Sequence, residues 1–129
     1  MIIGIGTDII EIERVSRAIQ SRHFKNRVYA KSEQDYCESR GKQKAASYAV
    51  RFAGKEAFFK SLGTGIICNL NEVAIINDEL GAPHVKLSGK AAELSSKRNV
   101  NKIHISLSHS RDYATAVCIL ESDSHAAER

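Results

Sequence analysis

The strongest pattern of hydrophobic and polar positions runs over residues 44–62 and predicts a long helix. Along it Phe52, Glu56 and Phe59 point the same way at about 100° per residue, so a carboxylate interrupts an apolar stripe. Gly63 follows and is suited to end the helix, because glycine adopts positive φ freely. An ionised carboxylate removed from water is unstable without a partner, and Glu56 therefore requires a cation or several hydrogen-bond donors.

Shorter patterns on both sides predict strands and further helices. They comprise a strand over residues 2–7 with Asp8 at its end, helices over 9–20 and 32–37, a connecting segment over 24–29, strands over 70–76, 84–87, 102–108 and 113–120, and a helix over 88–98. Turn residues at 78–83 and 110–112 join neighbouring strands as hairpins. The order contains no β-α-β series, and it predicts an α+β fold with a mainly antiparallel sheet packed with helices. A duplicated β-helix-β plan is also compatible with it.

The chain has 129 residues, 43% hydrophobic and 26% charged, which is the size and balance of one domain. We assign residues 1–121 to this domain and expect residues 122–129, which lack periodicity, to form a flexible tail. No run of about eighteen apolar residues and no basic leader occurs, so we expect a soluble, cytoplasmic protein without a membrane segment. The three cysteines are far apart and form no CxxC motif, which favours reduced thiols over disulfides or a zinc site.

Charge is unevenly distributed along the chain. The formal net charge is +4, and no acidic residue occurs between Glu13 and Glu33. The cations of this stretch are Arg14, Arg17, Arg22, Lys25, Arg27 and Lys31. Such a surface attracts an acidic protein, a nucleic acid or an anionic membrane. The low aromatic content of 6% and the absence of Trp argue against a surface on which nucleic-acid bases stack.

Two carboxylates occupy places where an apolar core would exclude them. Asp8 follows the first strand and Glu56 lies in the main helix, and together they could hold Mg²⁺ with water and phosphate oxygens as the other ligands. A salt bridge between Glu56 and Lys60, four residues further on, explains Glu56 equally well. Asp8 alone would be an ordinary residue at the end of a strand.

The flank of the main helix is basic, with Lys44, Arg51 and Lys55 at helical spacing. A row of cations beside a carboxylate suits a phosphate ester, although such a row is more often a solvated face. Ser108 and His109 could donate hydrogen bonds to phosphate or could be simple turn residues. A serine nucleophile is not favoured, because adjacent strand residues face opposite sides and no GxSxG motif occurs.

Four motifs carry a resemblance that spans nearly the whole chain. They are GIGTDI around Asp8, RFAGKEAFFKSLGTG around Glu56, NDELGAP in the predicted hairpin and ISLSHSRDYA near the end. In this order and spacing the chain resembles the holo-acyl-carrier-protein synthase family of 4′-phosphopantetheinyl transferases. The resemblance implies that family's fold. It also implies transfer of the phosphopantetheine arm of coenzyme A to a serine of apo-acyl carrier protein, with release of adenosine 3′,5′-bisphosphate.

The resemblance also implies roles for individual residues. Asp8 and Glu56 match Mg²⁺ ligands, Glu56 could take the proton of the attacking serine directly or through a water, and Lys60 would stabilise the transferred phosphoryl group. The residues expected to bind coenzyme A are Lys44, Arg51, Lys55, Gly63, Gly65, Ser108 and His109. The residues expected to dock the acidic carrier protein are Arg14, Arg17, Arg22 and Lys25. The family further implies a homotrimer with active sites between subunits.

Three other functions stay open from the sequence alone. Within the family, a transferase of broader specificity would also modify carrier domains of polyketide or peptide synthases. A metal-dependent phosphate-ester hydrolase would use the same carboxylates with water as the acceptor. A small basic nucleic-acid-binding module would explain the Arg-rich stretch but would leave Asp8 and Glu56 without a role.

Overall fold

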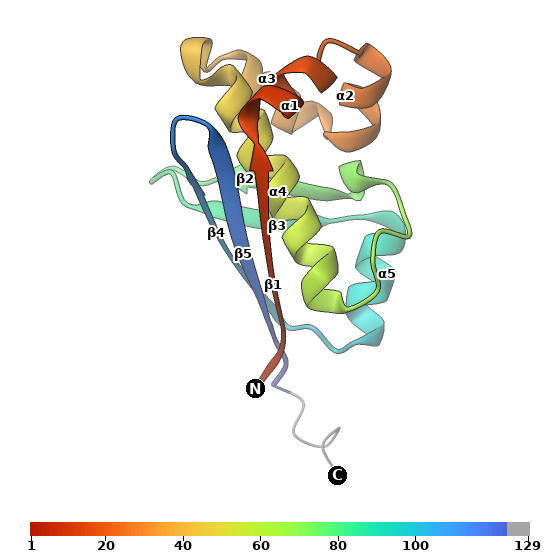
Figure 1. Ribbon diagram of the computed structural model, residues 1–129. Helices are drawn as coiled ribbons and strands as arrows, with labels where there is room; N and C mark the ends of the chain where they lie inside the picture. The colour runs from red at the N-terminus through yellow and green to blue at the C-terminus, as the bar shows by residue number, and fades with distance from the viewer. Residues whose placement is uncertain (124–129) are drawn as a thin grey trace.

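The computed structural model describes residues 1–123 and combines a three-stranded sheet, a hairpin and five helices (Figure 1). In chain order the elements are β1 (Ile2–Glu11), α1 (Ile12–Ala18), α2 (Arg22–Val28), α3 (Lys31–Glu38), the 3₁₀ turn η1 (Gly41–Gln43), α4 (Lys44–Leu62), the 3₁₀ turn η2 (Leu70–Glu72), β2 (Val73–Asn77), β3 (Pro83–Leu87), α5 (Gly89–Lys97), β4 (Lys102–His109) and β5 (Tyr113–Glu121). The strands pair in the order β1-β5-β4, with β2-β3 as a separate pair, and all pairings are antiparallel. The predicted α+β class is therefore confirmed.

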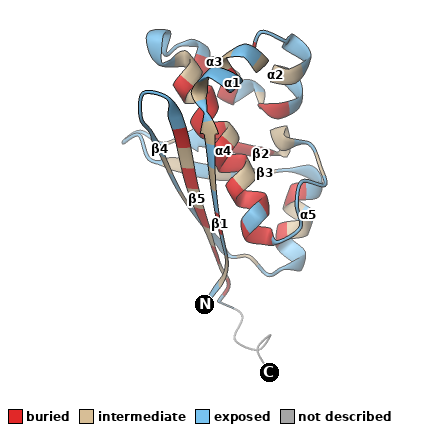
Figure 2. Ribbon diagram, in the orientation of Figure 1, coloured by how far each residue is buried: buried red, intermediate tan, exposed pale blue. Residues whose placement is uncertain are grey.

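Helix α4 is the centre of the structure and matches the predicted bounds. It packs on β1, β5 and β4, while α1, α2 and α3 gather at one end of it (Figure 1). Buried residues run along α4 and alternate along β5 (Figure 2). At its end Gly63 has φ of 77°, and its N–H donates to the carbonyl oxygens of Phe59 and Lys60. The predicted glycine ending is confirmed.

Two glycines let β1 lie directly on the backbone of α4. A Cβ atom at Gly4 would lie 2.0 Å from the carbonyl oxygen of Ser61, and one at Gly6 would lie 2.2 Å from that of Ala57. No side chain fits at such distances, so the strand and the helix touch backbone to backbone. This contact brings the next inward-facing residue of β1, Asp8, to the surface of α4.

The N-terminal third differs from the prediction in two places. Strand β1 pairs with β5 as far as Glu11 opposite Tyr113, so Asp8 lies within an edge strand and α1 begins only at Ile12. Residues 24–29, predicted to be a connection, belong largely to helix α2, whose N-terminus is capped by the Ser21 hydroxyl. The helix is short, and its stability depends on the packing of its buried residue Val28. A pattern of seven residues does not reveal such packing.

Smaller differences occur around the hairpin and at the C-terminus. Residues 70–72 form η2 and the strand starts at Val73, whereas the strand was predicted from residue 70. The N–H of Ser122 donates to the carbonyl oxygen of Met1, and that of Asp123 donates to Asn101. The rest of the predicted tail, residues 124–129, lies outside the described residues. None of the helices within residues 1–123 is long and apolar enough to cross a membrane.

The face of the sheet that points away from α4 is uncovered. Ile5 and Ile9 of β1 are each 63% exposed, and Tyr113 of β5 is 47% exposed. The register places Ile5 opposite Ile119 and Ile9 opposite Thr115, so these side chains form one surface. An exposed apolar surface of this kind is typical of a protein interface.

Candidate active site

Asp8 and Lys60 meet where β1 crosses α4. The Asp8 carboxylate Oδ1 lies 3.1 Å from the Lys60 Nζ, and the Asp8 side chain is 15% exposed while that of Lys60 is 54% exposed. Both residues line a hollow of about 470 Å³ that also includes Ser106, Ser108 and Thr115, here called the Asp8 hollow. The ion pair therefore stands at the wall of a surface cavity rather than in the core.

Glu56 lies one turn before Lys60 on α4 and is half-buried. Within residues 1–123, no hydrogen bond or ion pair joins its carboxylate to another residue. Burial raises the pKa of Glu56, and the negative charge of Asp8 raises it further, while Lys60 lowers it. The alternative interpretation of Glu56, a salt bridge with Lys60, is not what the structure contains, because the backbone contact at Gly6 brings Asp8 to Lys60 instead.

Two neighbouring carboxylates suit a hard divalent cation. Asp8 raises the pKa of Glu56, so a cation between the two would relieve their repulsion. In the described part of the chain no group of three or more His, Cys, Asp or Glu side chains could hold a metal alone. Ions such as Mg²⁺ commonly take one or two carboxylates and complete their shell with water and phosphate oxygens. The donor set fits such an ion when a phosphate ligand is also present.

Arg51 occupies a second hollow, of about 410 Å³, here called the Arg51 hollow. The residue is only 3% exposed. Its Nη1 donates to Ser47, its Nη2 donates to the side-chain amide oxygen of Asn77, and its guanidinium lies 4.6 Å from the centre of the Tyr36 ring. Its buried Nε has no hydrogen-bond partner among residues 1–123. A buried cation with a free N–H beside a cavity favours an anion. His109 lines the same hollow.

Lys55 does not belong to a ligand-binding surface. Its side chain is fully buried and its Nζ lies 2.7 Å from the carboxylate of Glu33, so the expectation that it binds coenzyme A is wrong. The flank of α4 that carries it faces α3 and β2 rather than solvent. Lys44, at the start of the same flank, is half-buried and lies 3.1 Å from Glu38. The predicted basic stripe is thus divided among three different environments.

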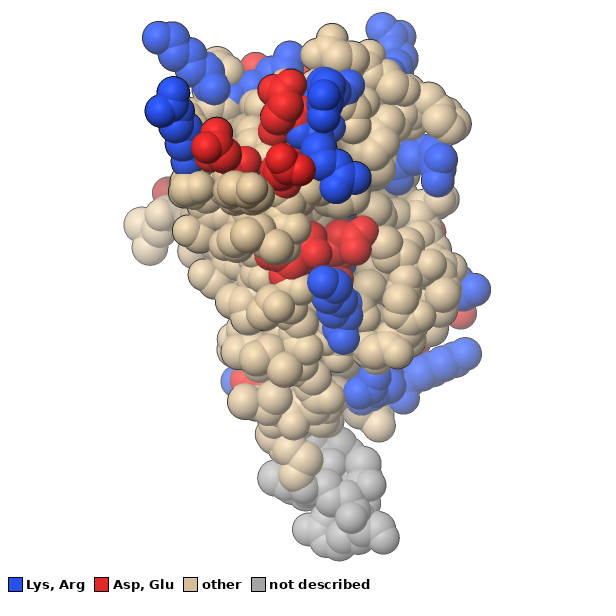
Figure 3. All heavy atoms as spheres, in the orientation of Figure 1, with Lys and Arg blue, Asp and Glu red and all other residues tan. Residues whose placement is uncertain are grey.

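The predicted docking cations gather at the end of the molecule formed by α1, α2 and α3, where Figure 3 shows Lys and Arg side chains around a few acidic ones. Arg14, Arg17 and Arg22 are exposed. Lys25 is partly covered, and its Nζ lies 3.0 Å from Glu38. The three arginines therefore remain available to an acidic partner, whereas Lys25 is engaged within the protein.

Glu38 gives a pH-dependent contribution to stability. Hydrogen bonds from the Tyr48 hydroxyl and then from Lys25 lower the pKa of Glu38 from 4.5 to about 2. A depressed pKa stabilises the fold above the unfolded value, and this stabilisation is lost as the pH falls from 4.5 towards 2. We expect Glu38→Gln to lower the free energy of unfolding at neutral pH by less than about 1 kcal/mol, because the side chain is largely exposed and screened. Urea unfolding at several pH values should show that the difference in free energy of unfolding between wild type and variant narrows below pH 4.5. A constant difference would contradict the role of the Glu38 carboxylate in stability.

Gly63 and Gly65, predicted to lie near the nucleotide, both have positive φ and are exposed. Ser108 and His109 are neighbours in β4 but line different hollows. Reasoning from the sequence did not identify Tyr36 or Asn77, which flank Arg51. The NDELGAP turn begins at Asn77 and was the available signal for that residue.

Comparison with known proteins places this geometry in a family. Residues 4–118 match the family model described as the 4′-phosphopantetheinyl transferase superfamily. The chain belongs to this superfamily. The holo-[acyl-carrier-protein] synthase of Ruminiclostridium cellulolyticum is 48% identical to this 4′-phosphopantetheinyl transferase over 120 residues, covering 90% of each chain.

Solved structures of the superfamily share the fold of this 4′-phosphopantetheinyl transferase. The crystal structure of holo-[acyl-carrier-protein] synthase from Neisseria meningitidis superposes with a TM-score of 0.86 at 29% identity, covering 95% of this chain and all of that one. A holo-(acyl-carrier-protein) synthase from Bacillus anthracis, solved in complex with CoA (3′,5′-ADP), gives a TM-score of 0.80 at 32% identity, with 95% and 99% covered. The predicted family and fold are confirmed.

Proposed function

We propose that this transferase is a holo-[acyl-carrier-protein] synthase, which moves the 4′-phosphopantetheine group of coenzyme A to a serine of apo-acyl carrier protein. The observation that carries the proposal is the ion pair of Asp8 and Lys60 at the Asp8 hollow with Glu56 one helical turn away, in a chain 48% identical to a holo-[acyl-carrier-protein] synthase. Two carboxylates and a lysine suit the transfer of a phosphoryl group from a diphosphate.

The residues of this group have distinct tasks in the proposed reaction. The serine Oγ forms a bond to the phosphorus that carries the pantetheine arm, and the bond from that phosphorus to the bridging oxygen breaks, which releases adenosine 3′,5′-bisphosphate. Glu56 accepts the proton of the serine hydroxyl, directly or through a water. Lys60 lies beside the transferred group and stabilises the negative charge on its oxygens.

Mg²⁺ is the metal that we propose for this site, with Asp8 and Glu56 as its protein ligands. When bound, the ion neutralises charge on the diphosphate of coenzyme A. The support is the fit of the donor set. It contains two carboxylates, and one of them, Glu56, makes no hydrogen bond or ion pair within residues 1–123 and has a pKa raised by burial and by the charge of the other.

Coenzyme A also carries a 3′-phosphate, and we propose that the Arg51 hollow binds it. The proposal is supported by the Nε of buried Arg51, which has no hydrogen-bond partner among residues 1–123. His109 lines the same hollow and is a further donor. Lys44, Ser108, Gly63 and Gly65 remain proposed contacts of the same substrate. Lys55 is excluded from the set by its burial.

A homotrimer with active sites between subunits would join these two regions. The Asp8 hollow and the Arg51 hollow share no lining residue within one chain. The uncovered sheet face around Ile5, Ile9 and Tyr113 is an apolar surface on which a second copy could pack. We therefore propose that one subunit supplies the carboxylates of a site and its neighbour supplies Arg51.

Carrier-protein docking is assigned to the exposed arginines of α1. Acyl carrier proteins are acidic, so the double change Arg14→Glu and Arg17→Glu should replace attraction by repulsion. We expect the KM for the carrier protein to rise about tenfold or more, with little change in the KM for coenzyme A. Steady-state kinetics with each substrate varied in turn measures both values, and high salt should reduce the difference between wild type and variant. Equal effects on the two KM values would show that the arginines of α1 do not dock the carrier protein.

Product analysis tests the reaction itself. Incubation with coenzyme A, Mg²⁺ and an apo-acyl carrier protein should release adenosine 3′,5′-bisphosphate in equal amount to the modified carrier. Release of the nucleotide without the carrier protein would indicate the phosphate-ester hydrolase. Modification of polyketide or peptide synthase carrier domains at comparable rates would indicate the transferase of broader specificity. We further propose a cytoplasmic location, which agrees with the three free cysteines among the described residues.

A further inference from the structure

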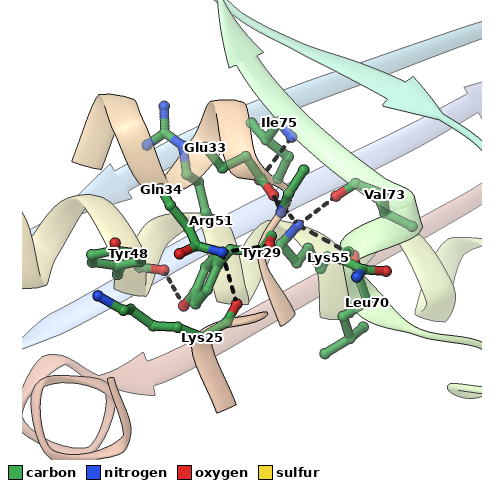
Figure 4. Close-up of polar contacts among 12 residues, drawn as sticks. Lys25, Tyr29, Glu33, Gln34, Tyr48, Arg51, Lys55, Leu70, Val73 and Ile75 are labelled. Atoms are coloured by element: carbon green, nitrogen blue, oxygen red, sulfur yellow. Dashed lines mark hydrogen bonds and ion pairs between the residues drawn. The ribbon is translucent and has the colours of Figure 1, made fainter. Parts of the chain in front are cut away.

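Lys55 and Glu33 form an ion pair in the interior of the protein (Figure 4). Both side chains are fully buried, and burial lowers the pKa of Lys55 while the charge of Glu33 opposes that shift. Neither charge reaches the Asp8 hollow or the Arg51 hollow, so the proposed reaction does not use them. A buried ion pair adds little net stability compared with a well-packed apolar pair. Its presence beside Glu56 therefore calls for another explanation.

The pair connects four separate segments of the chain. The Lys55 ammonium donates to Glu33 and to the carbonyl oxygens of Leu70 (3.2 Å) and Val73 (2.6 Å), so all three of its hydrogens have acceptors. The Glu33 carboxylate accepts from the N–H groups of Ala30 and Ile75, each at 2.9 Å. Helix α4 is thereby fixed to the start of α3, to η2 and to β2, as the dashed lines in Figure 4 show.

Two of these segments continue into the walls of a third hollow, which contains Glu56. This Glu56 hollow has a volume of about 400 Å³ and lies between α2, through Phe24 and Val28, and the segment that ends at Leu70. Leu70 both lines the hollow and accepts a hydrogen bond from Lys55. The two walls are also linked to each other, because the Asn71 amide donates to the carbonyl oxygen of Asn26 in α2.

The α2 wall is fixed to the same point from the other side. Tyr29, which directly follows α2, is buried with its ring centre 5.5 Å from the Lys55 Nζ. Its hydroxyl donates to the carbonyl oxygen of Tyr48 in α4 at 2.8 Å. The next residue, Ala30, donates its N–H to Glu33. Lys55, the residue that precedes Glu56, is thus linked to one wall by its hydrogen bond to Leu70 and to the other through Glu33 and Ala30.

We propose that Lys55 and Glu33 are positioning residues that hold both walls of the Glu56 hollow at the spacing through which the acceptor serine of the carrier protein enters. The inference rests on the proposed function for the identity of that acceptor. It assigns the opening to the carrier rather than to coenzyme A because α2, which forms one wall, also carries Arg22 and Arg27 and adjoins the docking arginines of α1.

Lys55→Met tests the proposal, because methionine fills a similar volume and donates no hydrogen bond. We expect kcat/KM for the carrier protein to fall by about tenfold or more, since small displacements of reacting groups have effects of this size. The KM for coenzyme A should change less than about twofold, because the ion pair reaches neither the Asp8 hollow nor the Arg51 hollow. A mere loss of folded protein would instead affect the rates with both substrates equally. Hydrogen exchange should become faster in residues 66–73 and 24–30 and stay unchanged at the β1–β5 pairing.

Ile103→Ala is the matched control, because it removes apolar contacts in β4 and Ile103 does not line the Glu56 hollow. This substitution should lower the melting temperature without a selective loss of kcat/KM for the carrier protein relative to coenzyme A. If Lys55→Met does not fold, the double variant Lys55→Met and Glu33→Gln replaces it, since no uncompensated charge is then buried.

Two outcomes would overturn the positioning role. One is a folded variant with wild-type kinetics for the carrier protein, and the other is unchanged exchange in both walls. Failure of the wild-type protein to modify the carrier would instead contradict the proposed function. In that case the exchange measurement still decides whether the ion pair holds the walls.

Discussion

Glu56→Gln is expected to lower the rate of phosphopantetheine transfer about 10³-fold, because the change removes both a proton acceptor and a metal ligand. Glutamine has nearly the same shape and Glu56 makes no hydrogen bond or ion pair within residues 1–123, so the fold should be retained. Single-turnover kinetics with saturating substrates measures the loss directly. Near-normal turnover in the variant would exclude Glu56 from the reaction.

The same variant should be slightly more stable than the wild type at neutral pH without metal. Burial and Asp8 raise the pKa of Glu56 above 4.5, so the ionised group destabilises the folded state once the pH exceeds the folded pKa. The difference should be small, on the order of 0.5 kcal/mol, because the group is only partly buried and solvent screens it. It should disappear below pH 4.5, where Glu56 is protonated in both states. Lower stability of the variant at neutral pH would contradict the absence of a partner for Glu56.

Gly6→Ala is expected to destabilise the fold by about 4 kcal/mol or more, which is an exceptional value for a single methyl group. The added Cβ would lie 2.2 Å from the carbonyl oxygen of Ala57 and 2.6 Å from the backbone nitrogen of Ser61, and neither atom can move without displacing α4. Urea unfolding measures the effect, and circular dichroism reports whether the variant folds at all.

Gly41→Ala is the control for the loss of glycine itself. Gly41 has φ of 58° and no atom within 4 Å of the position of a Cβ, so only backbone strain of about 1 kcal/mol is expected. Similar losses for the two variants would show that β1 can move away from α4. In that case the backbone contact would not be what places Asp8 beside Lys60.

Local patterns predicted the elements that depend on local interactions. The bounds of α4, its ending at Gly63 and the presence of β4 and β5 followed from local patterns, since each element is long enough for its residues to show a repeat. Helix α2 was missed because its seven residues are too few to show a helical period, and because its packing partners lie far away in the chain.

Long-range contacts decided the candidate site, and local spacing could not foresee them. Lys60 is four residues from Glu56, yet it pairs with Asp8, which is 52 positions away, because Gly6 allows the strand to touch the helix. Lys55 appeared to belong to a basic surface because Glu33, its partner across 22 positions, gives no sign in the sequence of being buried. The pairing of Asp8 with Glu56 was predicted from the two residues themselves, and the family resemblance implied the same pair. In the fold the charge of Asp8 adds to the effect of burial in raising the pKa of Glu56, so the two carboxylates lie near each other.

The intact mass of an apo-acyl carrier protein after incubation with this protein, coenzyme A and Mg²⁺ is the decisive test of phosphopantetheine transfer. We expect a gain of one phosphopantetheine group, which is lost when EDTA is added or when the acceptor serine of the carrier is replaced by alanine. An unchanged carrier mass with intact coenzyme A would contradict the proposed transfer.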